Sequence, residues 1–340
     1  MNRHRQVIQV VAVALALLML AACGGDRGDA TKGSVTIYSG RTQNLIEPIL
    51  KRFADETGID VKVRYGQSAD LALLINEEGD KTPADLFISQ SPGSVGFLDS
   101  KGRLGKLPDE VLNLVPAGLH AKDGSWVGLS GRKRVLVYSP KLSESTLPTT
   151  VFDLTKSEWK GRLGVAPSNA SFQDFVTAMR DAKGDEVTKK WLEGIAANDA
   201  FVYANNNAIV AAVDRGEIEI GLVNHYYVFQ SLAENPSFKA KNHDFAPDDL
   251  GSLLIVSAAA VIGGSKHSKE AAQLAQYLLN EEAQRYFSDQ TYEYPLAAGV
   301  TATSVLPPID FRAAAGIDFD RLGGDLESTR KMIRDAGLEG

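Results

Sequence analysis

The chain alternates between short apolar runs and longer segments whose apolar residues recur every three to four positions. The runs at 35–38, 61–63 and 85–88 predict strands, and the segments between them predict amphipathic helices. The first of these helices would be capped by Asn44 and ended by Gly58. This strand–helix rhythm is typical of an α/β protein in which helices flank a mostly parallel sheet.

The same rhythm starts again in the second part of the chain. The expected strands are 163–166, 218–223 and 253–262. The expected helices are one ending at Gly184, others at 186–197, 206–215 and 326–336, and one or two within 268–290. Two such series predict two lobes with a cleft between them, and ligands in open α/β sheets lie at the carboxyl ends of strands.

The N-terminus has a different pattern. A positively charged start is followed by an apolar run at 10–20 and by small residues before Cys23, the only cysteine. This is the layout of a secretory signal, and the run is shorter than the roughly 20 residues of a membrane span. The position of Cys23 resembles the bacterial lipobox, so we expect a signal peptide at 1–22, a lipidated Cys23 and a glycine-rich tether at 23–33. An ordinary signal peptide with a chance cysteine is the alternative.

Composition narrows the classes of partner and site. With its single cysteine at the N-terminus, the chain can form neither an internal disulfide nor a cluster of thiolate metal ligands. The net charge is −7, and no long basic run occurs, which argues against a nucleic-acid partner.

Two adjacent tyrosines, Tyr226 and Tyr227, open a helix directly after the strand at 218–223. A phenolate is a hard oxygen donor, and a trivalent cation such as Fe³⁺ can displace the phenolic proton. Adjacent helical residues lie about 100° apart, so both rings reach one ion only at a helix end or kink. Tyr138, at the end of a strand, is a third candidate. The alternatives are packed rings with hydroxyls in water, and a core or hinge tyrosine at 138.

Anion-binding groups are also present. Arg41 and Arg132 each follow a Ser-Gly pair, and either guanidinium could hold an anion unless it lies exposed on the surface. Ser168 and Asn169 precede a helix, where backbone N–H groups could cradle an anion or the side chains could cap the helix. Enzyme motifs are missing: there is no His-Glu-x-x-His, Gly-x-Ser-x-Gly or P-loop sequence, so we expect a binding protein and not an enzyme.

Five phrases together carry a family resemblance: 38–41 (Tyr-Ser-Gly-Arg), 77–85, 129–132 (Leu-Ser-Gly-Arg), 224–227 (Asn-His-Tyr-Tyr) and 293–296 (Glu-Tyr-Pro-Leu). With them the chain resembles the ferric-iron-binding proteins of bacterial ABC importers, which are two-lobed class II periplasmic binding proteins. The similarity extends from Ser34 to the C-terminus. It implies two hinge crossings, lobe 1 at 34–132 plus 257–305, and lobe 2 at 133–256 plus 306–340.

The resemblance implies that Tyr226 and Tyr227 are iron ligands and that Tyr138 matches a third tyrosine used by some members. It also implies that Asn206 and Asn224 lie near the site.

The chain departs from the family where many members have a histidine and a glutamate ligand, since it has Arg41-Thr42 and Gln90 there. We therefore expect Fe³⁺ to be bound by three phenolates and completed by carbonate or another small anion. Arg41 and Arg132 would balance this anion, with help from Ser168 and Asn169.

The expected function is capture of ferric iron outside the cytoplasm and delivery to an ABC permease, after closure of the lobes by a hinge motion. The protein would be a monomer that touches the membrane only through its lipid anchor. One rival is the same fold with another solute, such as an organic or phosphate-containing anion, thiamine or a polyamine. A second rival is an extracytoplasmic hydrolase.

Overall fold

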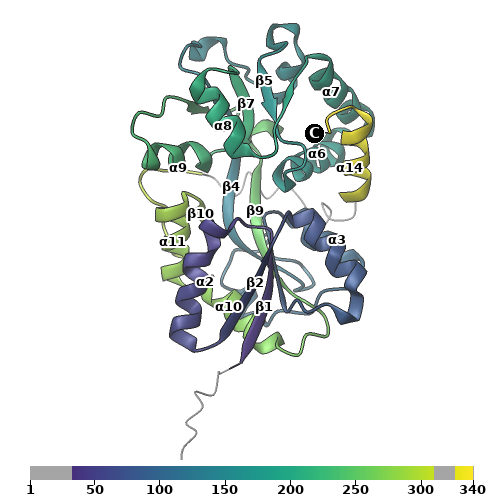
Figure 1. Ribbon diagram of the computed structural model, residues 1–340, viewed down its shortest axis with the longest axis vertical. Helices are drawn as coiled ribbons and strands as arrows, with labels where there is room; N and C mark the ends of the chain where they lie inside the picture. Colours follow the sequence, from purple (N-terminus) through teal and green to yellow (C-terminus); the bar gives the residue numbers. More distant parts are fainter. Residues whose placement is uncertain (1–32, 310–325, 340) are drawn as a thin grey trace, which may run out of the picture. The chain divides into compact units, whose positions relative to one another are not determined.

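The computed structural model describes residues 33–309 and 326–339, and strands and helices alternate there much as expected (Figure 1). The predicted signal peptide, Cys23 and all of the tether except Gly33 lie outside the described residues, as does 310–325 of the second predicted lobe. The strands are β1 Ser34–Ser39, β2 Asp60–Tyr65, β3 Leu86–Ser89, β4 Val127–Tyr138, β5 Leu163–Val165, β6 Phe201–Val202, β7 Ile220–Asn224, β8 Lys241–His243, β9 Leu254–Val261 and β10 Tyr294–Pro295.

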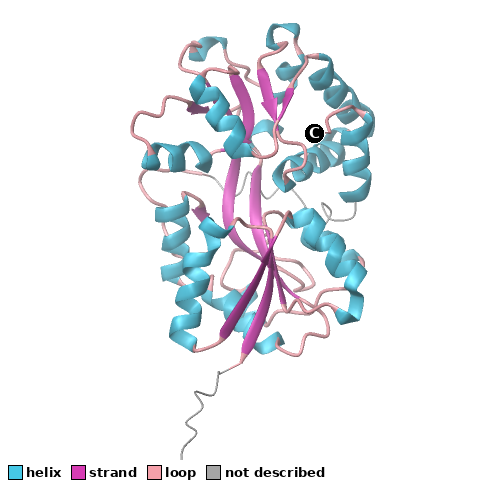
Figure 2. Ribbon diagram, in the orientation of Figure 1, coloured by secondary structure: helices cyan, strands magenta, loops and turns pink. Residues whose placement is uncertain are grey.

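Helices flank the strands (Figure 2). They are α2 Gln43–Thr57, α3 Ser68–Glu78, α4 Pro92–Ser100, α5 Asp109–Leu112, α6 Ala170–Lys183, α7 Asp185–Ala197, α8 Asn206–Arg215, α9 Tyr226–Glu234, α10 Ser268–Tyr277, α11 Glu281–Thr291 and α14 Leu326–Asp335. Gly58 ends α2 in the left-handed conformation with φ of 72°, as predicted. The N-cap of α2 is Thr42, so the prediction of Asn44 as the cap was wrong by two residues.

The strands form one sheet in the order β2-β1-β3-β9-β4-β7-β5-β6, with β8 and β10 also paired to β4. Strand β4 belongs to both parts of this sheet: residues 127–133 pair with β9, and residues 134–138 pair with β7. We call β1–β3, β9, β10 and residues 127–133 the first half, and β5–β8 with residues 134–138 the second half.

Parallel pairing occurs among β1, β2 and β3 and among β5, β6 and β7. Strands β4 and β9, which lie at the centre in Figure 1, are antiparallel to each other and to their other neighbours. The sheet is therefore more mixed than predicted, because β4 leads the chain into the second half and β9 begins where the chain returns.

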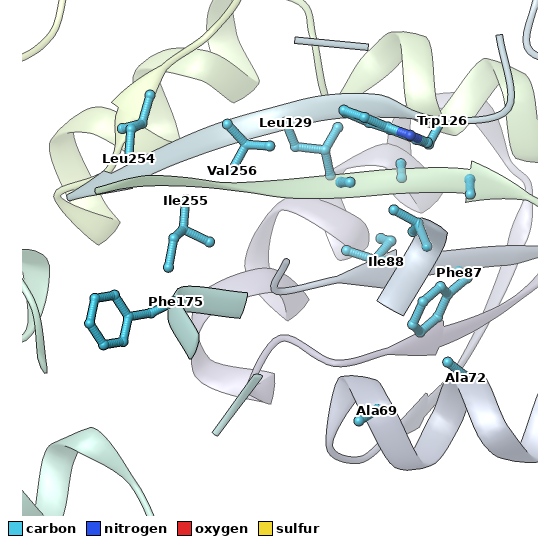
Figure 3. Packing of buried hydrophobic residues seen from close by; sticks show 14 of the residues in the cluster. Ala69, Ala72, Phe87, Ile88, Trp126, Leu129, Phe175, Leu254, Ile255 and Val256 are labelled. Carbon is cyan, nitrogen blue, oxygen red and sulfur yellow. The ribbon is translucent and has the colours of Figure 1, made fainter. Parts of the chain in front are cut away.

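Both halves are built on buried apolar strands. Leu129 and Val256 lie on the two central strands, and Ile88 and Phe87 on the neighbouring β3 (Figure 3). All eight residues of β9 are buried, which explains its continuous apolar sequence. Within the described part of the chain, no helix combines the length and apolarity needed to span a membrane.

Candidate ligand site

Tyr226 and Tyr227 lie at the first turn of α9, immediately after β7 and the N-cap residue His225. Their rings stack, with centroids 4.0 Å apart and planes 30° from parallel, and both side chains are buried. Two adjacent residues can direct their rings to the same place here because the helix is only beginning. The pair thus presents two phenol groups side by side.

The two phenols line a small polar cavity of about 110 Å³. Its other walls come from both halves of the sheet and carry only neutral side chains. They are Thr42, Asn44, Leu45, Gln67, Gln90, Asn169, Asn205, Asn207 and Gln230. A site of this kind offers hydroxyl and amide oxygens, which suit a hard cation, and no formal charge of its own.

Three residues predicted near the site, Thr42, Gln90 and Asn169, line this cavity. Gln90 donates from Nε2 to the carbonyl oxygen of Gly40 at 2.5 Å, while its buried Oε1 has no partner among the described residues. Asn169 caps α6, since its Oδ1 accepts the backbone N–H of Ser171 at 3.0 Å. Helix capping and a place in the cavity wall are thus compatible for Asn169.

The other predicted neighbours do not line it. The side chain of Ser168 instead lines a separate cavity of about 490 Å³ with Tyr203 and Arg330. Asn224 lies behind the cavity, where its Oδ1 accepts from Arg134 at 3.2 Å. Asn206 is buried, and neither atom of its amide group has a partner in the described part of the chain.

Tyr138 does not join the pair. It lies opposite Ile220, whereas Asn224, next to the tyrosines, lies opposite Arg134. Four residues of strand place Tyr138 about 13 Å from that end of β7. Its hydroxyl donates to Glu144 at 2.6 Å, and burial together with Glu144 raises the pKa of Tyr138 to about 12. The structure therefore does not bring the Tyr138 phenol together with Tyr226 and Tyr227.

Arg41 forms an ion pair with a residue that does not line the cavity. Its two terminal nitrogens donate to the two carboxylate oxygens of Glu293, at 3.0 and 2.7 Å, and both residues are buried. Ser130 donates to the same carboxylate, and Arg41 lies over the ring of Phe287. Burial alone would raise the pKa of Glu293, but Arg41 holds it below its ordinary value. The structure therefore places the charge of Arg41 against an internal carboxylate, outside the lining of the cavity.

Arg132 and Arg134 lie on β4 where it changes partner, and they differ from Arg41. Both are buried, and no ion pair with a carboxylate is found for either in the described residues. Arg132 Nε and Nη2 have no hydrogen-bond partner there, nor has Arg134 Nε. The terminal nitrogens of Arg134 donate to Ser171, Asn224 and the carbonyl oxygen of Leu222. Burial lowers the pKa of Arg134 to about 9, so it is still charged at neutral pH.

Arg132 and Arg134 interact electrostatically with the phenol groups of Tyr226 and Tyr227. Burial raises the pKa of Tyr226 well above its ordinary value, and Tyr227 raises it further, while Arg132 opposes this rise. Tyr227 in turn interacts electrostatically with Arg134. Tyr226 therefore keeps its proton until a strong positive charge enters the cavity, and the two guanidinium groups favour the phenolate that then forms.

His225 is buried and neutral, because burial lowers its pKa to about 4. Its Nδ1 accepts the backbone N–H of Lys133 at 3.1 Å, and its ring stacks on Tyr294 at 4.9 Å. It therefore joins the start of α9 to the point where β4 changes partner. Among residues 33–309 and 326–339, no three His, Cys, Asp or Glu side chains gather as a metal cluster.

Sequence reasoning missed Arg134, Glu293 and His225 as parts of this region. Glu293 and His225 stand inside two of the phrases that carried the resemblance, and Arg134 stands two residues after Arg132. Arg134 stands in the basic run 132–134 just before the apolar residues 135–137, and no local pattern distinguishes it from a surface charge.

Known proteins similar to this chain are bacterial solute-binding proteins. The family described as "Bacterial extracellular solute-binding protein" matches residues 81–321. The Fe(3+)-binding periplasmic protein of Serratia marcescens is 30% identical over 328 residues, which are 95% of this chain and 96% of that protein. Iron-bound HitA from Pseudomonas aeruginosa has a TM-score of 0.85 and 36% identity, covering 90% of this chain and 99% of that one. Ferric iron-binding protein A of Mannheimia haemolytica, in an open conformation, has a TM-score of 0.70 and 25% identity, covering 90% and 99%.

Proposed function

The chain belongs to the bacterial extracellular solute-binding proteins, and we propose that its solute is ferric iron, bound by the phenolates of Tyr226 and Tyr227. The observation that carries this proposal is the stacked, buried pair of phenols in a small polar cavity, each interacting electrostatically with a buried arginine. The relatives from Serratia and Pseudomonas are named for binding iron, which supports the same solute here.

The chemistry of the donors favours a hard trivalent ion. A softer cation is held better by thiolates and imidazoles, which the cavity lacks among its lining residues. The phenols must lose their protons when the ion binds, and the positive charge of Fe³⁺ supplies the driving force. Arg132 and Arg134 assist, because each stabilises negative charge on a neighbouring phenol oxygen.

A small anion such as carbonate completes the site. Two phenolates leave Fe³⁺ with one positive charge, and the two arginines add more, so a negative group is needed. Arg132 is the residue that would hold it, since its Nε and Nη2 are without partners among the described residues. Asn169 and Gln90, in the wall of the cavity, are placed to complete the polar surroundings.

As a member of this family the protein works outside the cytoplasm as the solute-binding component of an ABC transporter, and it is not an enzyme. We propose further that it is a monomer tethered to the membrane through a lipid on Cys23. The two halves of the sheet would be the two lobes, opening to admit iron and closing over it. Relatives have been solved both iron-bound and in an open conformation, which supports such a motion.

The test is to load the iron-free protein with ferric iron, with and without bicarbonate, and to record the visible spectrum. We expect a phenolate-to-iron charge-transfer band that is stronger with bicarbonate. The double variant Tyr226→Phe, Tyr227→Phe should lose the band, while Tyr138→Phe, the matched control, should keep it. If the double variant kept the charge-transfer band, the proposal would be contradicted. Tight binding of an organic anion with no binding of ferric iron, measured by titration calorimetry, would favour another solute on the same fold.

A further inference from the structure

A buried carboxylate joins the two halves beside the cavity. Asp174 lies on α6, whose Ser171 accepts from Arg134 and Asn224 of the second half. Asp174 Oδ2 accepts the backbone N–H of Gly93 at 3.2 Å. Gly93 lies in the first turn of α4, which packs on β3 and β9 of the first half. The side chain of Asp174 is only 2% exposed, so water does not substitute for this contact.

The contact lies close to the ligand cavity on both sides. Gln90 lines the cavity and stands three residues before Gly93. Asn169 lines it as well and stands five residues before Asp174. Each partner therefore lies three to five residues along the chain from a residue of the cavity wall, one partner in each half. Separation of these walls must break the Gly93–Asp174 hydrogen bond.

The close approach of Asp174 explains why residue 93 is a glycine. A Cβ added to Gly93 would lie 2.3 Å from Asp174 Oδ1 and 3.1 Å from its Cγ, and no other residue is among its three nearest contacts. Gly93 does not have positive φ, so its backbone conformation does not require glycine. The absence of a side chain at 93 serves the approach of Asp174.

We propose that Asp174 is a positioning residue that holds the two halves closed over the solute by capping the first turn of α4. The first turn of a helix presents free N–H groups, and an oxygen of Asp174 can accept from them. On another wall of the cavity, Gln230 Nε2 donates to the carbonyl oxygen of Thr291 at 3.1 Å and also joins the halves. The identity of the solute rests on the proposed function, whereas the contact itself does not.

The first test measures iron release. Iron-loaded protein is mixed with excess EDTA, and loss of the phenolate band is followed in time. Asp174→Ala should release iron about tenfold faster than the unmodified protein, equivalent to roughly 1.4 kcal/mol. Asp181→Ala is the matched control, because Asp181 is an exposed aspartate on the same helix. Equal rates for the two variants would overturn the proposal.

A double-mutant cycle tests whether Gly93 and Asp174 act together. Gly93→Ala alone should also accelerate release about tenfold or more, because its Cβ meets the carboxylate. In the Asp174→Ala background the obstacle is gone, and Gly93→Ala should change the rate less than twofold. Effects that multiply would overturn the proposal.

Small-angle scattering separates this inference from the proposed function. The iron-free Asp174→Ala protein should have a larger radius of gyration than the iron-free unmodified protein, while Asp181→Ala should not. An equal radius for Asp174→Ala would overturn the inference even if iron binds. A larger radius would support it even if no phenolate band appears with ferric iron, a result that would overturn only the proposed solute.

Discussion

Arg41 and Glu293 form an ion pair in the first half of the molecule, whereas Arg132 and Arg134, equally buried, have no carboxylate paired with them among the described residues. A similar contrast separates two of the buried carboxylates, Glu293 and Asp174. Glu293 has a pKa below its ordinary value because Arg41 and Arg132 outweigh the effect of burial, but burial raises the pKa of Asp174 to about 7.

Whether a buried charge has an ion-pair partner indicates whether it serves the stability of the fold or the binding of a ligand. A buried charge without a partner costs far more than a paired one, so a fold that only needs stability pairs its charges or removes them. Arg41 and Glu293 satisfy each other and help to fix β10 beside β4. Arg132 and Arg134 keep their positive charge available beside the phenols, which is what a negatively charged ligand shell around a cation requires.

The largest effect should come from breaking the internal pair. Glu293→Gln leaves Arg41 buried without an opposite charge, and we expect the free energy of unfolding to fall by roughly 3–5 kcal/mol. Urea unfolding followed by circular dichroism measures this. Glu281→Gln is the control, because it breaks an exposed ion pair with Arg285 that contributes little. Similar losses in the free energy of unfolding for both variants would show that the buried ion pair stabilises the fold no more than an exposed one.

Asp174→Asn tests how the ionisation of the second carboxylate affects the stability of the fold. The folded-state pKa of Asp174 is raised to about 7, above roughly 3.9 in the unfolded chain. Its protonated form therefore supports the fold at low pH, and this support is lost as pH rises through 7. The Gly93 N–H and Arg132 oppose the shift without reversing it.

Because asparagine stays neutral, the stability of Asp174→Asn relative to the unmodified protein should increase by roughly 2–3 kcal/mol between pH 5 and pH 8. Urea unfolding at the two pH values gives this difference, with Asp181→Asn as the control. A difference between variant and unmodified protein that is the same at both pH values would contradict the prediction.

The smallest effect on stability should follow Arg132→Met, because the ion pair of Glu293 with Arg41 stays in place. We expect a change of less than about 1 kcal/mol in stability and an affinity for ferric iron about tenfold weaker in bicarbonate. Without bicarbonate the affinities of variant and unmodified protein should approach each other. Competition with a coloured chelator measures the affinities. If the affinities of the two proteins for ferric iron depended equally on bicarbonate, Arg132 would not be part of the anion site.

Much of the fold could be predicted from the sequence because strands such as β1 and β9 and helices such as α2 have strong apolar patterns. Two-residue strands, β6 and β10, are too short to produce a pattern. The antiparallel centre was also missed, because strand direction depends on which distant segments pair, and β4 has three partners besides β9.

The site was predictable only in part. Tyr226 and Tyr227 could be recognised because two adjacent tyrosines follow a buried strand. The distance of Tyr138 from this pair could not be predicted, because it depends on the register of β4 against β7, which no local pattern reveals. Arg134, Glu293 and Asp174 resemble ordinary surface charges in the sequence, and only tertiary packing buries them.

The pairing of β3 with β9 has a consequence for how the chain is made. Ile88 pairs with Ala259, 171 positions later, and β3 has no other neighbour on that side. The N-terminal strands therefore lack their inner edge partner until most of the polypeptide has been synthesised. Contacts between such distant segments form slowly. For a chain that we propose to be secreted, this delay leaves time for export before the first half can complete its sheet.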